Sequence, residues 1–266
     1  MSISTGCHSP FVTEAVVLGQ TAYGEADRVM TLYTRSHGKV SAIAQAARRS
    51  RGRFGASLAL FVVGEATLRE PPRRDLLVLE RFDVRRDLSG LAVDVVRFAH
   101  ASYATELVRE LTVPHKAEPE LLDLLVELYD VVARTEPSAD TLRAFELRLL
   151  FELGVSPELT RCVECGEADE MALARAGTVA SPHKGGLLCS SCAKRVFAAD
   201  TRPLPPAARE RLMGLMALGS LELAAALPRA PAPLAATVRD ILHAILAGHL
   251  ARPLRSLAFI NQLRSA

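Results

Sequence analysis

The fold of the N-terminal region is decided by residues 28–44, which run RVMTLYTRSHGKVSAIA. Residues 28–34 alternate across a pleat, with Val29, Thr31 and Tyr33 opposite Met30 and Leu32. His37-Gly38 is a turn signal, and residues 39–44 continue the strand-like pattern. The stretch therefore predicts two strands joined by a tight turn.

Three more short strands are predicted around this hairpin, at residues 11–18, 61–68 and 76–82. Five strands within about 75 residues suit a small closed β-barrel, since a sandwich would usually need about seven. Between these strands, no helical stretch is longer than the linker at residues 44–57. We therefore expect residues 1–83 to form a five-stranded β-barrel domain.

The hydrophobic period lengthens to three or four residues after residue 87, which is typical of helices. Helices are predicted at residues 91–111, from Pro119 onward, at residues 140–154, from Pro205-Pro206 through Leu223, and across residues 234–245 and 254–263. We expect one helical domain in two parts, residues 84–157 and 199–266, so that the whole chain is a multidomain α+β protein.

Residues 158–198 interrupt these helices and contain four of the five cysteines. Cys162-x-x-Cys165 and Cys189-x-x-Cys192 are separated by 23 residues. Each pair can place two sulfurs on one metal ion, and the two pairs together complete a tetrahedron. The sequence therefore predicts a zinc module at residues 158–198, in which Zn²⁺ is structural and its ligands are Cys162, Cys165, Cys189 and Cys192.

Other chemistry for these cysteines is disfavoured. Residues 1–10 lack a signal-peptide pattern, so we expect a cytoplasmic chain in which disulfides are rare. A dithiol redox centre would need a thioredoxin-like βαβ unit around one pair. A catalytic zinc keeps an open position; His183 is a conceivable substitute ligand, although a solvated loop histidine is the commoner role. Cys7 is expected to be an exposed thiol.

Charge is concentrated in the N-terminal region, although the formal net charge of the chain is only +2. No acidic residue lies between Asp27 and Glu65, whereas seven basic residues do: Arg28, Arg35, Lys39, Arg48, Arg49, Arg51 and Arg53. Such a block on a small barrel predicts a polyanion-binding surface. Tyr23, Tyr33 and Phe54 are the aromatic residues available to stack on bases. An ordinary solvated arginine loop stays an open alternative.

The sequence contains no motif that supports catalysis. It lacks a phosphate-binding glycine loop, a dinucleotide fingerprint, a Gly-x-Ser-x-Gly elbow and the metalloprotease and deaminase zinc signatures. The most apolar stretch, residues 212–227, is shorter than the ~20 residues that a membrane helix needs. We therefore expect a soluble, non-enzymatic protein.

In order along the chain, these features resemble the bacterial recombination mediator family RecO. The matching stretches are YGEADR at 23–28, HGKV at 37–40, AARR at 46–49, LRAFELRLL at 142–150 with Gly154, CVECG at 162–166 and GGLLC at 185–189. The resemblance implies that the barrel is an oligonucleotide-binding (OB) fold and that the chain acts at the nucleoid in DNA repair.

The family resemblance also implies a set of partners. These are single- and double-stranded DNA, whose complementary strands it would anneal, the mediator RecR, and the acidic tail of the single-strand-binding protein (SSB) during recombinase loading. Such a tail would need an apolar groove rimmed by basic residues, for which Arg143, Arg148, Arg209 and Arg211 are candidates.

Two other functions remain open from the sequence. The chain could be a zinc-ribbon adaptor that bridges proteins without touching DNA, and charge reversal of the four arginines at 48–53 would then leave DNA binding unchanged. A zinc-dependent hydrolase is the third hypothesis, which the closed set of four thiolates disfavours.

Overall fold

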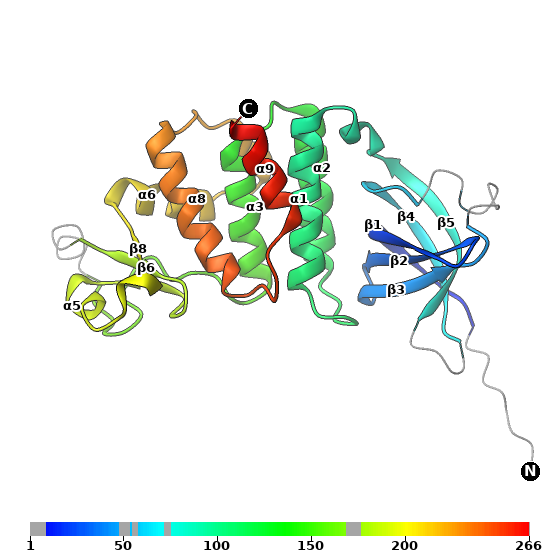
Figure 1. The fold of residues 1–266 in the computed structure, drawn as a ribbon, viewed down its shortest axis with the longest axis horizontal. Helices are drawn as coiled ribbons and strands as arrows, with labels where there is room; N and C mark the ends of the chain where they lie inside the picture. Colours follow the sequence, from blue (N-terminus) through cyan, green and yellow to red (C-terminus); the bar gives the residue numbers. More distant parts are fainter. Residues whose placement is uncertain (1–8, 48–53, 55–57, 72–75, 169–176, 266) are drawn as a thin grey trace, which may run out of the picture. The chain divides into compact units, whose positions relative to one another are not determined.

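The computed structural model describes residues 9–47, 54, 58–71, 76–168 and 177–265, which form two compact units. The first unit comprises Met1–Arg134 and Ser256–Ala266, and the second comprises Thr135–Arg255 (Figure 1). Among the described residues, no helix combines the length and the apolarity needed to cross a lipid bilayer.

The first unit begins with a closed five-stranded barrel, which confirms the predicted fold. Its strands are β1 (Phe11–Tyr23), β2 (Asp27–Thr34), β3 (Gly38–Ala44), β4 (Val62–Arg69) and β5 (Leu77–Asp87). They pair in the order β1-β2-β3-β5-β4, and only the β3–β5 contact that closes the barrel is parallel. Strands β1 and β5 each extend beyond their expected ends at residues 18 and 82.

Successive side chains of β2 alternate between the barrel interior and the outer face of the strand. Met30 and Leu32 are fully buried in a core that also contains Val17, Leu68 and Phe82. These side chains are apolar and closely packed, so they supply most of the barrel's stability. The opposite side of β2 carries Tyr33, which is also buried, because helices of the same unit cover that side.

The helices of the first unit are η1 (Ser89–Ala92), α1 (Val95–Leu111), α2 (Pro119–Arg134) and α9 (Arg255–Ser265). Asp94 begins α1 by accepting hydrogen bonds from the backbone of Val96 and Arg97, a standard N-cap. The C-terminal helix α9 returns to this unit, where the Glu106 carboxylate accepts bonds from the Ser256 N–H and hydroxyl at 2.8 and 2.5 Å.

The second unit packs three helices around α3 (Ala139–Glu152), namely α6 (Pro206–Met216), α7 (Leu221–Ala225) and α8 (Ala232–Ala247). Its small sheet, in the order β7-β6-β8, consists of Gly186–Leu188, Val179–Ser181 and Arg202–Pro203, with short helices α5 (Ser190–Ala193) and η2 (Ala198–Asp200) beside it. The helix expected from Pro206 through Leu223 is interrupted, because α6 ends at Met216 and Ser220 caps a new helix, α7.

By contacts, the helices divide between the two units. Helices α1, α2 and α9 belong with the barrel, whereas α3, α6, α7 and α8 belong with the small sheet. The hydrophobic period of a helix is the same in either setting, so periodicity identifies the helices and not their neighbours.

Candidate metal centre and nucleic-acid interface

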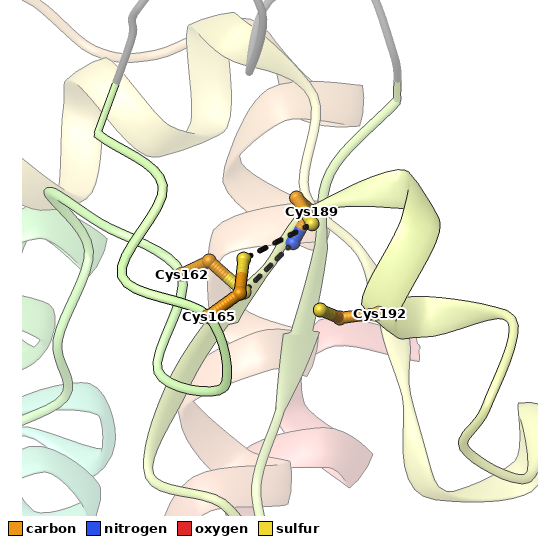
Figure 2. A group of neighbouring side chains, drawn as sticks. All are labelled: Cys162, Cys165, Cys189 and Cys192. Carbon is orange, nitrogen blue, oxygen red and sulfur yellow. Dashed lines mark hydrogen bonds between the residues drawn. The ribbon is translucent and has the colours of Figure 1, made fainter.

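The four predicted metal ligands form one cluster (Figure 2). The sulfurs of Cys162, Cys165, Cys189 and Cys192 all lie within 4.8 Å of one another. The Cys165 and Cys189 sulfurs are 3.8 Å apart. Four ligands at a Zn–S distance of about 2.3 Å would have sulfur–sulfur separations of about 3.8 Å, so the cluster has the dimensions of a tetrahedral thiolate site.

Backbone hydrogen bonds hold the two halves of the cluster together. The loop that carries Cys162 is joined to β7, because the Leu187 N–H donates to the Glu158 carbonyl at 2.8 Å and the Val163 N–H donates to the Leu187 carbonyl at 2.9 Å. Gly166 closes the first turn in the left-handed region, with φ of +75°, where a side chain would be strained.

The cluster's electrostatics favour a divalent cation. Burial would raise the pKa of Cys162, but backbone N–H groups of Cys189, Cys165 and Glu164 outweigh it and lower that pKa to about 6. The Glu167 N–H favours the Cys165 thiolate, yet the neighbouring sulfurs raise its pKa to about 12. Without a cation, one thiolate therefore suppresses ionisation of the next. A bound Zn²⁺ would let all four ionise, so the donor set fits a structural zinc.

The alternative zinc ligand lies outside this cluster. The His183 side chain is 71% exposed, and its Nε2 atom is 3.7 Å from the Asp200 carboxylate. The remaining cysteine, Cys7, lies outside the described residues.

Three of the seven predicted DNA-contacting cations lie within the described residues, and these three do not gather at one end of the barrel. Arg28 pairs with Ala44 across β2 and β3, whereas Thr34 pairs with Gly38 at the opposite end of the same strands. Arg28 therefore lies where the chain leaves β3 toward residues 48–53, which carry Arg48, Arg49, Arg51 and Arg53 and lie outside the described residues. Arg35 and Lys39 lie at the other end of the barrel.

We call the first of these the open end, defined by Tyr23, Arg28 and residues 44–47. Arg28 is half-buried and donates a hydrogen bond to the side-chain oxygen of Gln20. The Asp27 carboxylate accepts a bond from the Ala46 N–H at 2.8 Å, which ties the β1–β2 hairpin to the chain entering the basic segment.

We call the second the sealed end, defined by Tyr33, Arg35, Gly38 and Lys39. Arg35 bonds Glu14 at 2.7 Å and Asp123 of α2 at 2.5 Å, and these hydrogen bonds raise its pKa. Lys39 donates to the Arg109 carbonyl of α1 at 2.5 Å, and burial lowers its pKa. Both cations contact the helices packed on the barrel, so protein groups already engage them.

Only one of the three candidate stacking residues is accessible. Tyr33 is fully buried and its hydroxyl donates to the Glu118 carbonyl at 3.2 Å, while Phe54 is 2% exposed in the barrel core. Tyr23, at the open end, is 56% exposed. Alternation along β2 put Tyr33 and Met30 on opposite sides of the strand, but no local pattern could show that helices cover the side of Tyr33.

In the second unit, Leu218 lines two cavities of about 520 and 210 Å³, which we together call the Leu218 groove. Of the four candidate basic residues, Arg211 lines the larger cavity and Arg148 the smaller. Arg143 is buried against Glu146 at 2.6 Å. Arg209 donates to the Leu159 carbonyl at 2.7 Å. Glu210 and Glu152 also line the groove, so its rim carries both signs of charge.

Comparison with known proteins covers nearly the whole chain. Residues 9–86 match the family model described as recombination protein O N terminal, and residues 92–258 match recombination protein O C terminal. The chain is 41% identical over 251 residues to DNA repair protein RecO of Anaeromyxobacter sp. (strain K), covering 93% of this chain and 94% of that protein.

More distant relatives carry the same name. The chain is 34% identical to DNA repair protein RecO of Myxococcus xanthus, over 94% of this chain and 96% of that protein. It is also 34% identical to DNA repair protein RecO of Geobacter sulfurreducens, over 96% and 98%. The chain therefore belongs to the RecO family of DNA repair and recombination proteins.

Proposed function

We propose that this chain is a non-enzymatic recombination mediator that binds single- and double-stranded DNA through the open end of its barrel. The supporting observation is that Tyr23 and Arg28 lie beside residues 44–47, which lead in sequence into the basic segment at residues 48–53. Arginine side chains suit phosphate oxygens, and an exposed aromatic ring suits an unpaired base. Arg35 and Lys39, which the sequence grouped with these residues, contact Asp123 of α2 and the Arg109 carbonyl of α1.

Because the proposed contacts are mostly to phosphates, binding should depend little on sequence. Holding strands through their backbones also leaves base edges available for pairing, which is compatible with annealing of complementary strands. DNA binding would also place the protein at the nucleoid.

The decisive experiment is fluorescence anisotropy with labelled single- and double-stranded oligonucleotides at two salt concentrations. We expect reversal of Arg28, Arg48, Arg49, Arg51 and Arg53 to glutamate to weaken binding more than tenfold, since each lost phosphate contact reduces affinity. Arg81→Glu is the matched control, because Arg81 is an exposed barrel arginine that is paired with Asp83 at 2.6 Å. Undiminished binding by the open-end variant would instead support a protein-bridging adaptor.

Tyr23 provides a second, more specific test of the open end. If its ring stacks on a base, Tyr23→Ala should reduce single-strand affinity about fivefold or more, whereas Tyr23→Phe should keep it. Equal behaviour of the two variants would remove Tyr23 from the interface and leave the arginines to be judged separately.

We propose that the four-cysteine cluster holds one structural Zn²⁺. When bound, the ion would cross-link the loop after α3 to the β7–α5 turn and would perform no chemistry on a substrate. Metal analysis should find one zinc per chain, and Cys162→Ser/Cys192→Ser should lose it and lower the unfolding temperature of the second unit. Zinc bound with an exchangeable water, or a full complement of zinc in the double variant, would contradict this assignment.

We further propose that the Leu218 groove receives the acidic, apolar-ended tail of the single-strand-binding protein. Leu215 of α6 and Leu234 of α8 contribute to the apolar lining, and Arg211 and Arg148 each line one of the two cavities that share Leu218. Leu218→Glu should abolish binding of a labelled tail peptide, whereas Leu223→Glu, at an exposed leucine on α7, should not. Equal binding by both variants would exclude this groove.

Together with RecR, the chain would then help to load the recombinase onto strands covered by the single-strand-binding protein. Loading assays with the Leu218→Glu and open-end variants should separate the two contributions. The first variant should fail only on strands covered by the single-strand-binding protein, and the second should also fail on bare strands.

A further inference from the structure

The zinc-bearing part of the second unit exposes an aromatic ring that no contact described above uses. Phe197 follows α5 and is 83% exposed. A single exposed apolar side chain is ordinary on a protein surface. Phe197 differs because backbone hydrogen bonds fix the chain on both sides of it and because exposed cationic residues lie near it in the sequence.

The chain leading to Phe197 is fixed by the cysteine cluster. The Arg195 N–H donates to the Cys192 carbonyl at 3.0 Å, and the Val196 N–H donates to the Ala193 carbonyl at 3.2 Å. The Arg195 guanidinium also contacts the Cys192 sulfur at 3.0 Å. After the ring, the Asp200 N–H donates to the Phe197 carbonyl at 2.9 Å. Phe197 is therefore held on two successive tight turns, which reduces the entropy lost when a ligand binds.

Two exposed cationic residues, Lys194 and Arg202, lie on either side of Phe197 in the sequence. Lys194 is exposed and lies three residues before Phe197, after the single turn of α5. Arg202 is exposed, and its Nη1 atom donates to the Ala199 and Thr201 carbonyls at 3.0 and 2.8 Å, which fixes the guanidinium on the turn that follows the ring. Those bonds involve one nitrogen, and the guanidinium has two more that can reach an anion. The carboxylate within this turn, Asp200, lies near the His183 imidazole.

We propose that Phe197, Lys194 and Arg202 form a second contact for single-stranded nucleic acid, in which the ring stacks on an unpaired base and the two cations meet the flanking phosphates. A stacking ring between cations is the usual way in which proteins hold single strands without reading their sequence. A purely apolar protein partner would leave both cations without a counter-charge. The proposal rests on the proposed DNA-binding function and deepens it, because it gives each of the two units its own strand contact.

A second contact has a consequence for annealing. A chain that touches nucleic acid through both units can engage two strand segments at once, and the local concentration of one strand beside the other then rises. Loss of Phe197 should therefore slow annealing more than it weakens the binding of one short strand.

The test uses the full-length, zinc-loaded protein and labelled oligothymidylate, with an abasic oligonucleotide of the same length as the second ligand. Phe197→Ala should reduce affinity for oligothymidylate about fivefold and affinity for the abasic strand less than twofold. Lys194→Glu/Arg202→Glu should reduce both. Leu223→Ala is the matched control, since Leu223 is an exposed apolar residue of the same unit. Zinc content and the unfolding temperature should be those of the parent protein in all variants.

The outcomes separate this inference from the proposed function. If Phe197→Ala binds both oligonucleotides normally while the open-end variant does not, the zinc-module contact is wrong and the barrel function stands. If Phe197→Ala weakens both ligands equally, the ring does not stack and the inference also fails. If neither the open-end nor the zinc-module variants alter binding, both proposals fail, and Phe197 would belong to a protein interface.

Discussion

The two ends of the barrel carry the same kinds of residue and use them differently. At the sealed end, Arg35 and Lys39 are engaged by Asp123 of α2 and by the last turn of α1. At the open end, Arg28 has the neutral Gln20 as its partner, and Tyr23 is exposed to solvent. The comparison shows that a count of basic residues measures available charge, whereas the packing of the helices decides which of those charges a ligand can reach.

Helix electrostatics explain why a lysine suits the sealed end. The Arg109 carbonyl lies in the last turn of α1, where backbone carbonyls have lost their intrahelical donors and carry partial negative charge. Lys39 supplies a donor to that turn, although burial disfavours its charged form. Its neighbour Gly38 lets the loop after α1 pass close by, and the Lys39 carbonyl accepts a bond from the His115 N–H at 3.0 Å.

The largest predicted difference between the two ends concerns their turn glycines. Gly38 and Gly24 both have positive φ, +62° and +60°, but a Cβ on Gly38 would lie 1.9 Å from the Lys116 carbonyl oxygen, whereas Gly24 has no atom within 4 Å. Gly38→Ala should therefore lower the free energy of unfolding by about 3 kcal/mol or more, through strain and collision with backbone. Gly24→Ala should lower it by only about 1 kcal/mol. Urea denaturation of both variants measures the difference, and equal losses would contradict the sealed-end packing.

The next prediction concerns salt. If Arg28, Arg48, Arg49, Arg51 and Arg53 contact phosphates of a single strand, the slope of log affinity against log salt should be about −3.5, at −0.7 for each contact. Arg28→Gln should reduce its magnitude by about 0.7, and Arg35→Gln should leave it unchanged. A fall in slope with Arg35→Gln would mean that the sealed end opens to DNA.

Much of this architecture could be predicted from the sequence. Alternation in β2 put Met30 and Leu32 on one face, which the structure shows to be the core face, and the spacing of Cys162, Cys165, Cys189 and Cys192 predicted the cluster, because both signals are local or follow a fixed motif. The roles of Arg35 and Lys39 could not be predicted, since Asp123 and the Arg109 carbonyl lie 88 and 70 residues away in sequence. Burial of Tyr33 depends on the same distant helices.

A smaller effect should appear in the pH dependence of stability. Burial lowers the pKa of Lys39 below its ordinary 10.5, so the folded state disfavours the charged amine. Between the lowered pKa and 10.5 the unfolded state binds more protons, and this residue's contribution to stability rises with pH there. The Tyr33 hydroxyl has the opposite effect above pH 10. Burial raises its pKa, so it stays protonated in the folded state and its contribution to stability falls as the pH rises. The informative measurement compares the free energy of unfolding of the parent protein with that of Lys39→Met at pH 8 and at pH 10.5. The parent's value minus the variant's value should be larger at pH 10.5 than at pH 8.

The smallest effect should belong to the ion pair that most visibly joins barrel and helix. Arg35 and Asp123 meet at 2.5 Å, but their side chains are 38% and 62% exposed, so solvent screens the attraction. A double-mutant cycle with Arg35→Gln and Asp123→Asn should give a coupling energy of about 0.5 kcal/mol, decreasing in high salt. A coupling several times larger would mean that this pair holds the sealed end. A small one would assign that role to Gly38 and Tyr33, which are buried, and to the half-buried Lys39.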